Sequence, residues 1–216
     1  MKLSERLNHP ISMGELERRW AAIRKAMAEA NIDVLVFQNN NDYMGGYVKY
    51  VTDLPATNGY PVTVIFPRDD DMTLIGQGPF DKKQNLPHEG DGVRRGIKTW
   101  LTTPSYASVH YTAAYDAKLA DASLQEYGRA TVGFVGTYQM SVVLADHLRD
   151  NSLKNARIVE ASDLVDRIKV IKSPEEIDAV KATAMMQDGA MKAAFDAIRP
   201  GMRDTEVAAI AQEYSQ

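Results

Sequence analysis

Histidine and its acidic neighbours are the side chains of this sequence that could hold a metal ion or move a proton. The chain has four histidines, His9, His88, His110 and His147. No two of them have the spacing of a metal-ligand pair. His88-Glu89 begins like the zinc motif H-E-x-x-H, but Asp91 and Gly92 follow it, so the second histidine is missing. The histidines therefore predict no metal site.

Other catalytic motifs are also missing from the sequence. There is no cysteine, which excludes disulfides and thiolate chemistry. No serine lies in a nucleophile-elbow motif. Gly76-Gln77-Gly78 lacks the third glycine and the following helix of a dinucleotide-binding turn. We therefore expect no catalytic residue, no metal ligand and no bound cofactor within these residues.

Composition narrows the classes of partner. The net charge of -4 gives no reason to expect nucleic acid or an anionic membrane. The strongest apolar run, Val62 to Phe66, is too short to span a bilayer, and the N-terminus has no apolar core of a signal peptide. We expect a soluble, cytoplasmic protein.

The first two thirds of the chain alternate helices with short apolar strands. Such alternation predicts an α/β domain, and a strand pair joined by the turn residues PRDDD makes its sheet mixed. Residues 39–59 and 78–96 are rich in glycine, proline and polar residues and are expected to be loops, the first with one helical turn. The expected helices are 13–30, capped by Ser12, 115–127 and 138–149, with a turn at 163–167; the expected strands are 32–37, 61–66, 72–76, 97–101, 131–135 and 157–160.

Two helices are expected near the end of the sequence. Ser173, Pro174 and Glu176 form a capping box with proline at the first helical position. A stripe along this helix is expected to be buried and consists of Ile177, Val180, Ala184, Met191, Phe195 and Ile198. Asp188 falls within that stripe, and we expect it at the edge, bonded to water or a backbone amide. Pro200-Gly201 ends the helix, and Asp204 or Thr205 is expected to cap the next.

Two blocks of this sequence resemble the creatinase, prolidase and aminopeptidase P family of pita-bread hydrolases. The first is IDVLVF followed by NNDYMGGY, which contains Asn40, Tyr43, Gly46 and Tyr47. The second is IKSPEEI at 171–177, Asp188, and PGMRDTE at 200–206. The resemblance implies a three-layer α/β N-terminal domain at 1–167, with a mixed sheet flanked by helices. It also implies that residues 168–216 are the linker and first two helices of an incomplete pita-bread α+β domain.

The family's chemistry lies outside this sequence. The resemblance implies a hydrolase whose two aspartates, histidine and two glutamates hold two divalent ions, Mn, Co or Zn, in residues that follow position 216. The usual substrate is a peptide bond that precedes proline, and the usual assembly is a homodimer. The resemblance therefore implies the N-terminal portion of an Xaa-Pro peptidase, inactive by itself.

In the family, the N-terminal domain also reaches over a partner's active site. Tyr43, Tyr47, Asn58 and Tyr60 are the candidates here for substrate access or dimer contact, since tyrosines suit contact surfaces. The alternative is that Tyr43 and Tyr47 only pack their loop against the sheet.

Two other functions stay open. Creatinases use the same scaffold without metal and hydrolyse creatine; they carry an arginine where this sequence has Tyr60, which favours a peptidase. Other relatives lose the metal ligands and serve as protein-binding or assembly modules.

Overall fold

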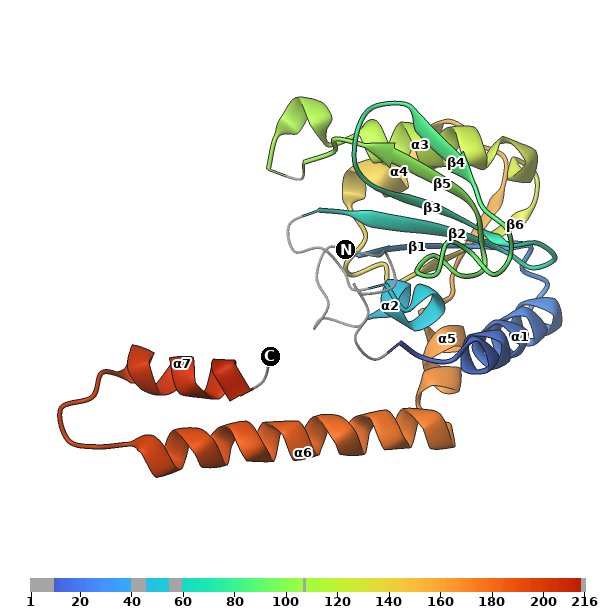
Figure 1. Cartoon of the computed structure of the whole chain (residues 1–216). Coiled ribbons are helices and arrows are strands. Elements are labelled where there is room, and N and C mark those ends of the chain that lie inside the picture. The colour runs from blue at the N-terminus through green and yellow to red at the C-terminus, as the bar shows by residue number, and fades with distance from the viewer. Residues whose placement is uncertain (1–9, 40–45, 55–59, 107, 215–216) are drawn as a thin grey trace. The chain divides into compact units, whose positions relative to one another are not determined.

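The computed structural model describes residues 10–39, 46–54, 60–106 and 108–214 (Figure 1). These residues form two compact units, one ending at Val170 and the other beginning at Ile171. The domain ranges 1–167 and 168–216 remain a prediction. Helix α5, Ser162–Lys169, lies in the first unit and replaces the turn expected at 163–167.

A seven-stranded mixed sheet organises the first unit, in the order β4-β5-β3-β2-β1-β6-β7. Strands β2 and β4 run antiparallel to their neighbours, and the other adjacent pairs are parallel. The predicted hairpin is confirmed, since β2 and β3 pair with Val64 opposite Leu74. The strands are β1 Val34–Asn39, β2 Val62–Pro67, β3 Met72–Gln77, β4 Lys82–Asn85, β5 Ile97–Thr103, β6 Thr131–Val135 and β7 Arg157–Glu160.

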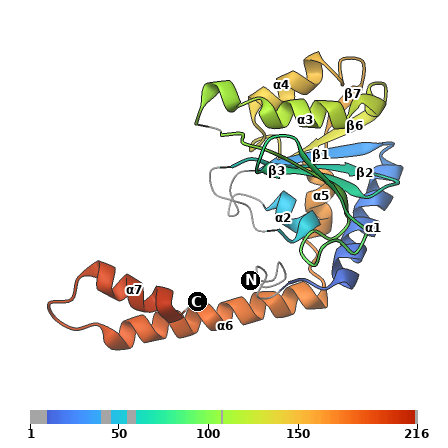
Figure 2. The same ribbon diagram turned by 45° about the horizontal axis from the view of Figure 1, so that its top comes forward.

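Helices cover both faces of this sheet, as Figures 1 and 2 show. Helices α1, α2 and α5 pack on one face, and α3 and α4 pack on the other. The fold is therefore the three-layer α/β arrangement that the sequence predicts. The helices of this unit are α1 Met13–Glu29, α2 Tyr47–Thr52, α3 Tyr115–Ser123, α4 Val142–Asp150 and α5 Ser162–Lys169, with 3-10 turns at His110–Thr112 and Gln125–Tyr127.

Strand β1 supplies residues to both apolar cores. Val34 and Val36 belong to the cluster under α3 and α4, whereas Leu35 and Phe37 belong to the cluster under α1, α2 and α5. This alternation follows from the period of two in a strand, and it explains why every residue of β1 is buried.

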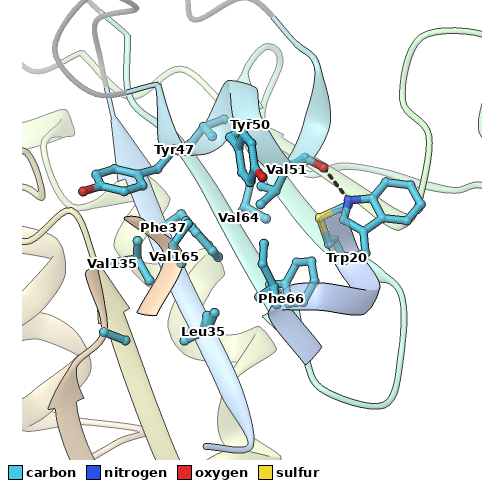
Figure 3. Packing of buried hydrophobic residues seen from close by; sticks show 14 of the residues in the cluster. Trp20, Leu35, Phe37, Tyr47, Tyr50, Val51, Val64, Phe66, Val135 and Val165 are labelled. Atoms are coloured by element: carbon cyan, nitrogen blue, oxygen red, sulfur yellow. Dashed lines mark hydrogen bonds between the residues drawn. The ribbon is translucent and has the colours of Figure 1, made fainter. Parts of the chain in front are cut away.

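The cluster under α1 depends on Trp20. Its indole Nε1 donates to the Val51 carbonyl at 2.7 Å, which ties α1 to α2 (Figure 3). Gly96 lies against the ring with φ at +64°, and a Cβ there would come within 2.4 Å of Trp20 Cη2. Only glycine fits both that backbone conformation and that close approach. Ser12 caps α1 as predicted, accepting from the Glu15 amide at 3.1 Å.

Three sequence predictions for this unit are wrong in detail. Residues 78–96 are not all loop, because Lys82–Asn85 form the edge strand β4, whose polar composition hides it from an apolar-pattern search. Helix α4 begins at Val142 rather than 138, since Ser141 caps it. The helix expected at 115–127 ends at Ser123, and Gln125–Tyr127 form a 3-10 turn.

The second unit is a helical hairpin made of α6 Pro174–Ala197 and α7 Asp204–Tyr214. The predicted capping box is present, with Glu176 N donating to Ser173 Oγ at 3.1 Å and Ser173 N donating to Glu176 Oε2 at 2.9 Å. Helix α7 starts at Asp204, so Asp204 lies in its first turn rather than capping it.

The apolar stripe predicted to be buried along α6 is exposed in this structure. Phe195 is 77% exposed and Met191 is 68% exposed, and Asp188 is exposed as well. The buried residues of α6 are Ala190 and Ala194. Small side chains line the approach of the two helices, where a Cβ on Gly189 would come within 2.5 Å of the Tyr214 ring. The hairpin packs on itself through small residues and leaves its large ones outside.

Candidate functional site

The carboxyl ends of the parallel strands β1, β3, β5, β6 and β7 lie at one edge of the sheet. Open α/β sheets bind ligands in crevices at this edge. The segments that follow β1, β3, β5 and β6 therefore position whatever polar or aromatic groups could form a site.

A buried polar network lies at this edge. Gln38, from the end of β1, donates through Nε2 to Asp116 Oδ2 at 2.7 Å and to Thr63 Oγ1 at 2.9 Å. Its Oε1 accepts from the Ser141 amide at 2.9 Å. Ser105 Oγ donates to Asp116 Oδ1 at 3.1 Å. The network joins β1 and β2 to the starts of α3 and α4.

Asp116 is the titratable group at the centre of this network, and it is 4% exposed. Burial raises the pKa of its carboxyl group, and the hydrogen bonds from Ser105 and Gln38 offset only part of that rise. Both carboxylate oxygens are occupied by donors on neighbouring elements. Asp116 therefore links helix α3 to the end of β1 and to the segment after β5.

An aromatic pocket lies beside the network, between β5 and α3. Its volume is about 370 Å³, within the range of small-molecule sites. The lining carries no group that is charged at neutral pH and consists of Phe80, Pro104, Tyr106, Val109, Tyr111, Thr112 and Tyr115. The pocket was not predicted from the sequence, where its signal is the group of tyrosines at 106, 111 and 115, five and four residues apart.

Thr112 fixes the wall of the aromatic pocket. Its Oγ1 accepts from the Tyr106 amide at 3.0 Å and lies 2.9 Å from the carbonyls of Tyr106 and Val109. Its own carbonyl oxygen lies 3.0 Å from Ser105 Oγ. The buried Thr112 side chain therefore holds the turn that carries the exposed rings of Tyr106 and Tyr111.

The candidate contact residues predicted from the sequence lie in different surroundings. Tyr43 and Asn58 fall outside the described residues. Tyr60 is partly buried, and its ring meets that of Tyr106 edge-on, with centroids 5.5 Å apart. Tyr60 therefore borders the aromatic pocket.

Tyr47 has a packing role. It is 4% exposed, and its hydroxyl donates to Asp166 Oδ2 at 2.9 Å, which joins α2 to α5. Lys169 Nζ lies 4.3 Å from the centre of the ring. Burial and the neighbouring Asp166 carboxylate raise the pKa of the hydroxyl further above its already basic range, so Tyr47 stays protonated.

Acid, base and metal chemistry have few candidates in the described part of the chain. His88 Nδ1 lies 2.8 Å from Asp71 Oδ2, on the turn side of the β2–β3 hairpin. Within residues 10–39, 46–54, 60–106 and 108–214 no three histidine, aspartate or glutamate side chains gather as a metal site would require. The described residues therefore do not fit a metal pair.

Known proteins resemble this chain in sequence and in fold. No family model matches the chain. A curated relative from Sinorhizobium fredii, the uncharacterized hydrolase/peptidase y4tL, is 28% identical over 206 residues, which are 90% of this chain and 48% of the relative. A second from the same bacterium, y4tM, is 26% identical over 207 residues. The chain spans about half the length of the curated relatives it matches.

Solved structures of two X-Pro peptidases have a fold similar to that of this chain. The Xaa-Pro dipeptidase from Bacillus anthracis matches with a TM-score of 0.62 at 17% identity, over 93% of this chain and 48% of that one. The X-Pro aminopeptidase from Thermotoga maritima matches with a TM-score of 0.66 at 13% identity, over 91% and 48%. The chain resembles the creatinase, prolidase and aminopeptidase P family. Its seven-stranded sheet with helices on both faces has a fold similar to that of about half of each of these two chains.

The aromatic pocket and the polar network both lie in the α/β unit. None of the helices in the described ranges has the length and apolar character needed to cross a bilayer.

Proposed function

We propose that this chain is the N-terminal portion of a cytoplasmic, metal-dependent hydrolase that cleaves peptides containing proline. The observation that carries the proposal is the 28% identity to a curated hydrolase/peptidase over nine tenths of this chain. The match of fold to a dipeptidase and an aminopeptidase, both named for X-Pro substrates, supports the choice of bond.

In this proposal, the metal ions and the groups that hold them belong to the half of the relatives' length that this chain does not span. Bound there, two divalent ions would activate a water and polarise the scissile carbonyl. The present chain is inactive by itself. Its own contribution is to shape access to the active site and to make contacts within a homodimer.

Tyr60 and Tyr106 are the residues we assign to that contact role. Their edge-to-face pair is held at the sheet edge by β2 on one side and by the Thr112 turn on the other. Tyrosine rings that already pack against each other lose little conformational freedom when a peptide or a partner covers them.

The direct test is an assay of the complete gene product with Xaa-Pro dipeptides and added Mn²⁺ or Co²⁺. Turnover that disappears with chelator and returns with metal supports the proposal. Turnover of creatine without metal would replace it by a creatinase function. If no substrate is cleaved and no metal binds, the hydrolase proposal is wrong and an assembly module remains.

The contact role has its own test in the complete protein. Tyr60→Ala should raise KM several-fold while changing kcat less, because it removes a contact made in the bound state. Tyr127→Ala is the matched control, since Tyr127 precedes β6 at the opposite edge of the sheet. Equal effects of the two substitutions would contradict the assignment of Tyr60.

A further inference from the structure

A second pocket adjoins the aromatic pocket and differs from it in carrying charge. It has a volume of about 250 Å³ and is lined by Phe80, Asp81, Thr102, Thr103, Tyr115, Lys118 and Leu119. The two pockets share Phe80 and Tyr115, whose rings meet edge-on at 5.2 Å between centroids. A ligand with a polar head and an apolar body could therefore occupy both.

We propose that these two pockets form one binding site for a free amino acid with an aromatic or large apolar side chain. The α-carboxylate pairs with Lys118, the α-ammonium group pairs with Asp81, and the side chain enters the aromatic pocket. The site lies wholly within the α/β unit, so it does not depend on the proposed hydrolase activity.

The charges of the polar pocket match a zwitterion. Asp81 and Lys118 are both exposed, and in the part of the chain that the structure describes neither forms an ion pair with the other or with a third residue. Two opposite charges that line one small pocket without pairing leave each available for a ligand. A free amino acid presents both complementary charges on adjacent groups, and charge-assisted hydrogen bonds are the strong ones.

The segment that carries Phe80 and Asp81 is fixed in place. Gly78 packs so closely on β5 that a Cβ would come within 2.7 Å of Thr102 Cβ. Thr102 Oγ1 donates to the Pro79 carbonyl at 2.7 Å. Asp81 then takes a left-handed conformation with φ at +53°, which few residues with a side chain adopt. This backbone sets Phe80 and Asp81 opposite α3.

Helix α3 supplies the other wall. Tyr115 and Lys118 are three residues apart and so project from the same side of the helix. Lys118 Nζ lies 5.9 Å from the centre of the Tyr115 ring. Asp116, on the same helix, is held inside by Gln38 and Ser105 and does not face the pocket as a competing anion. The aromatic rings next to these groups favour an aromatic ligand side chain over a polar one.

Isothermal titration of this chain with L-phenylalanine tests the proposal. We expect saturable binding that weakens about three- to tenfold for N-acetyl-L-phenylalanine and for L-phenylalanine amide, because each derivative removes one charge. Serine should bind more weakly than phenylalanine. Absence of binding up to about 10 mM, the weak limit for a small ligand, overturns the proposal. So does binding of all four compounds with equal affinity.

Two substitutions assign the charges to residues. Lys118→Gln should weaken L-phenylalanine binding and abolish the discrimination against the amide, while keeping the discrimination against the acetylated form. Asp81→Asn should do the reverse, and asparagine tolerates the left-handed conformation. Lys154→Gln and Asp150→Asn are matched controls on exposed residues elsewhere in the same unit. If either control behaves like its partner, or if both variants keep both discriminations, the assignment is wrong.

Discussion

The α/β unit and the helical hairpin contain similar amphipathic helices, yet only the first unit buries their apolar faces. In α1 the residues Leu16, Trp20, Ile23 and Met27 are all at most 1% exposed. In α6 the corresponding large residues lie outside, with Val180 60% and Phe195 77% exposed. The same spacing of apolar residues therefore gives a core in one unit and a surface in the other.

The difference separates what a pattern specifies from what packing supplies. Periodicity tells which residues share a face, and it predicted the stripe along α6. It does not tell what covers that face. Helix α1 faces a sheet, whereas α6 packs against α7, with Gly189 next to the Tyr214 ring, and its buried residues are the small Ala190 and Ala194. Tertiary burial supplies most of the stability of a helix, so the hairpin should be the weaker unit.

Truncating one phenylalanine in each unit should give the largest difference in stability loss between the two units. Phe66→Ala empties a fully buried site between β2 and α1 and should lower the free energy of unfolding by about 3–5 kcal/mol. Phe195→Ala, its matched control, removes an exposed ring and should change it by less than about 0.5 kcal/mol. Urea denaturation measures both. A loss at Phe195 comparable with that at Phe66 would mean that the hairpin face is covered.

A pair of aspartates compares a buried position in the α/β unit with an exposed position in the hairpin. Asp116→Asn disturbs a buried network and should cost about 1–3 kcal/mol, whereas Asp188→Asn, on the exposed face of α6, should cost little at any pH.

The cost at Asp116 should depend on pH. Its folded-state pKa is raised by burial, so the folded protein holds this proton more tightly than the unfolded chain. The contribution of the Asp116 carboxyl group to the free energy of unfolding is therefore fully present at low pH. It is lost as the pH rises from the ordinary pKa of 3.8 through the folded-state pKa. The difference in the free energy of unfolding between the native protein and the Asp116→Asn variant should therefore decrease over that pH range. If urea denaturation shows that this difference increases across the same pH range, the inferred direction of the pKa shift of Asp116 is wrong.

The two serine caps give the smallest contrast. Ser12 and Ser173 each accept from the amide three residues later at 3.1 Å. Ser12→Ala should lower the free energy of global unfolding by about 1 kcal/mol, since α1 unfolds with the core. Ser173→Ala should leave that transition unchanged and should reduce only the helical circular dichroism. If Ser173→Ala shifts the global transition as far as Ser12→Ala does, the two units unfold together.

Much of the fold could be predicted from sequence because local chemistry dictates it. Ser12 and Ser173 marked two helix starts, PRDDD marked the hairpin turn, and the apolar runs marked the central strands. Strand β4 could not be found this way, because an edge strand with exposed polar residues has no apolar pattern. Helix α5 was underestimated because Val165 is its one fully buried residue.

The site was less predictable than the fold. Tyr47 and Tyr60 belong to one aromatic stretch, but burial against Asp166 gives the first a packing role and the approach of Tyr106 gives the second a place at a pocket. Asp116, Gln38 and Ser105 are far apart in sequence and carry no motif. Asp81 and Lys118 line one pocket only because the fold brings the segment after β3 and helix α3 together. Such sites depend on tertiary contacts, which spacing along one chain does not encode.

Amide hydrogen exchange on a dilute monomer of this chain is the most direct test of the contrast between the two units. We expect the amides of β1 and β6 to exchange only through global unfolding, because both strands lie inside the sheet between buried faces. The amides of residues 205–214 should exchange by local fraying, faster by orders of magnitude and at a rate that Phe66→Ala does not alter. Equal protection of residues 205–214 and β1 would show that the hairpin is as stable as the sheet and would contradict the account.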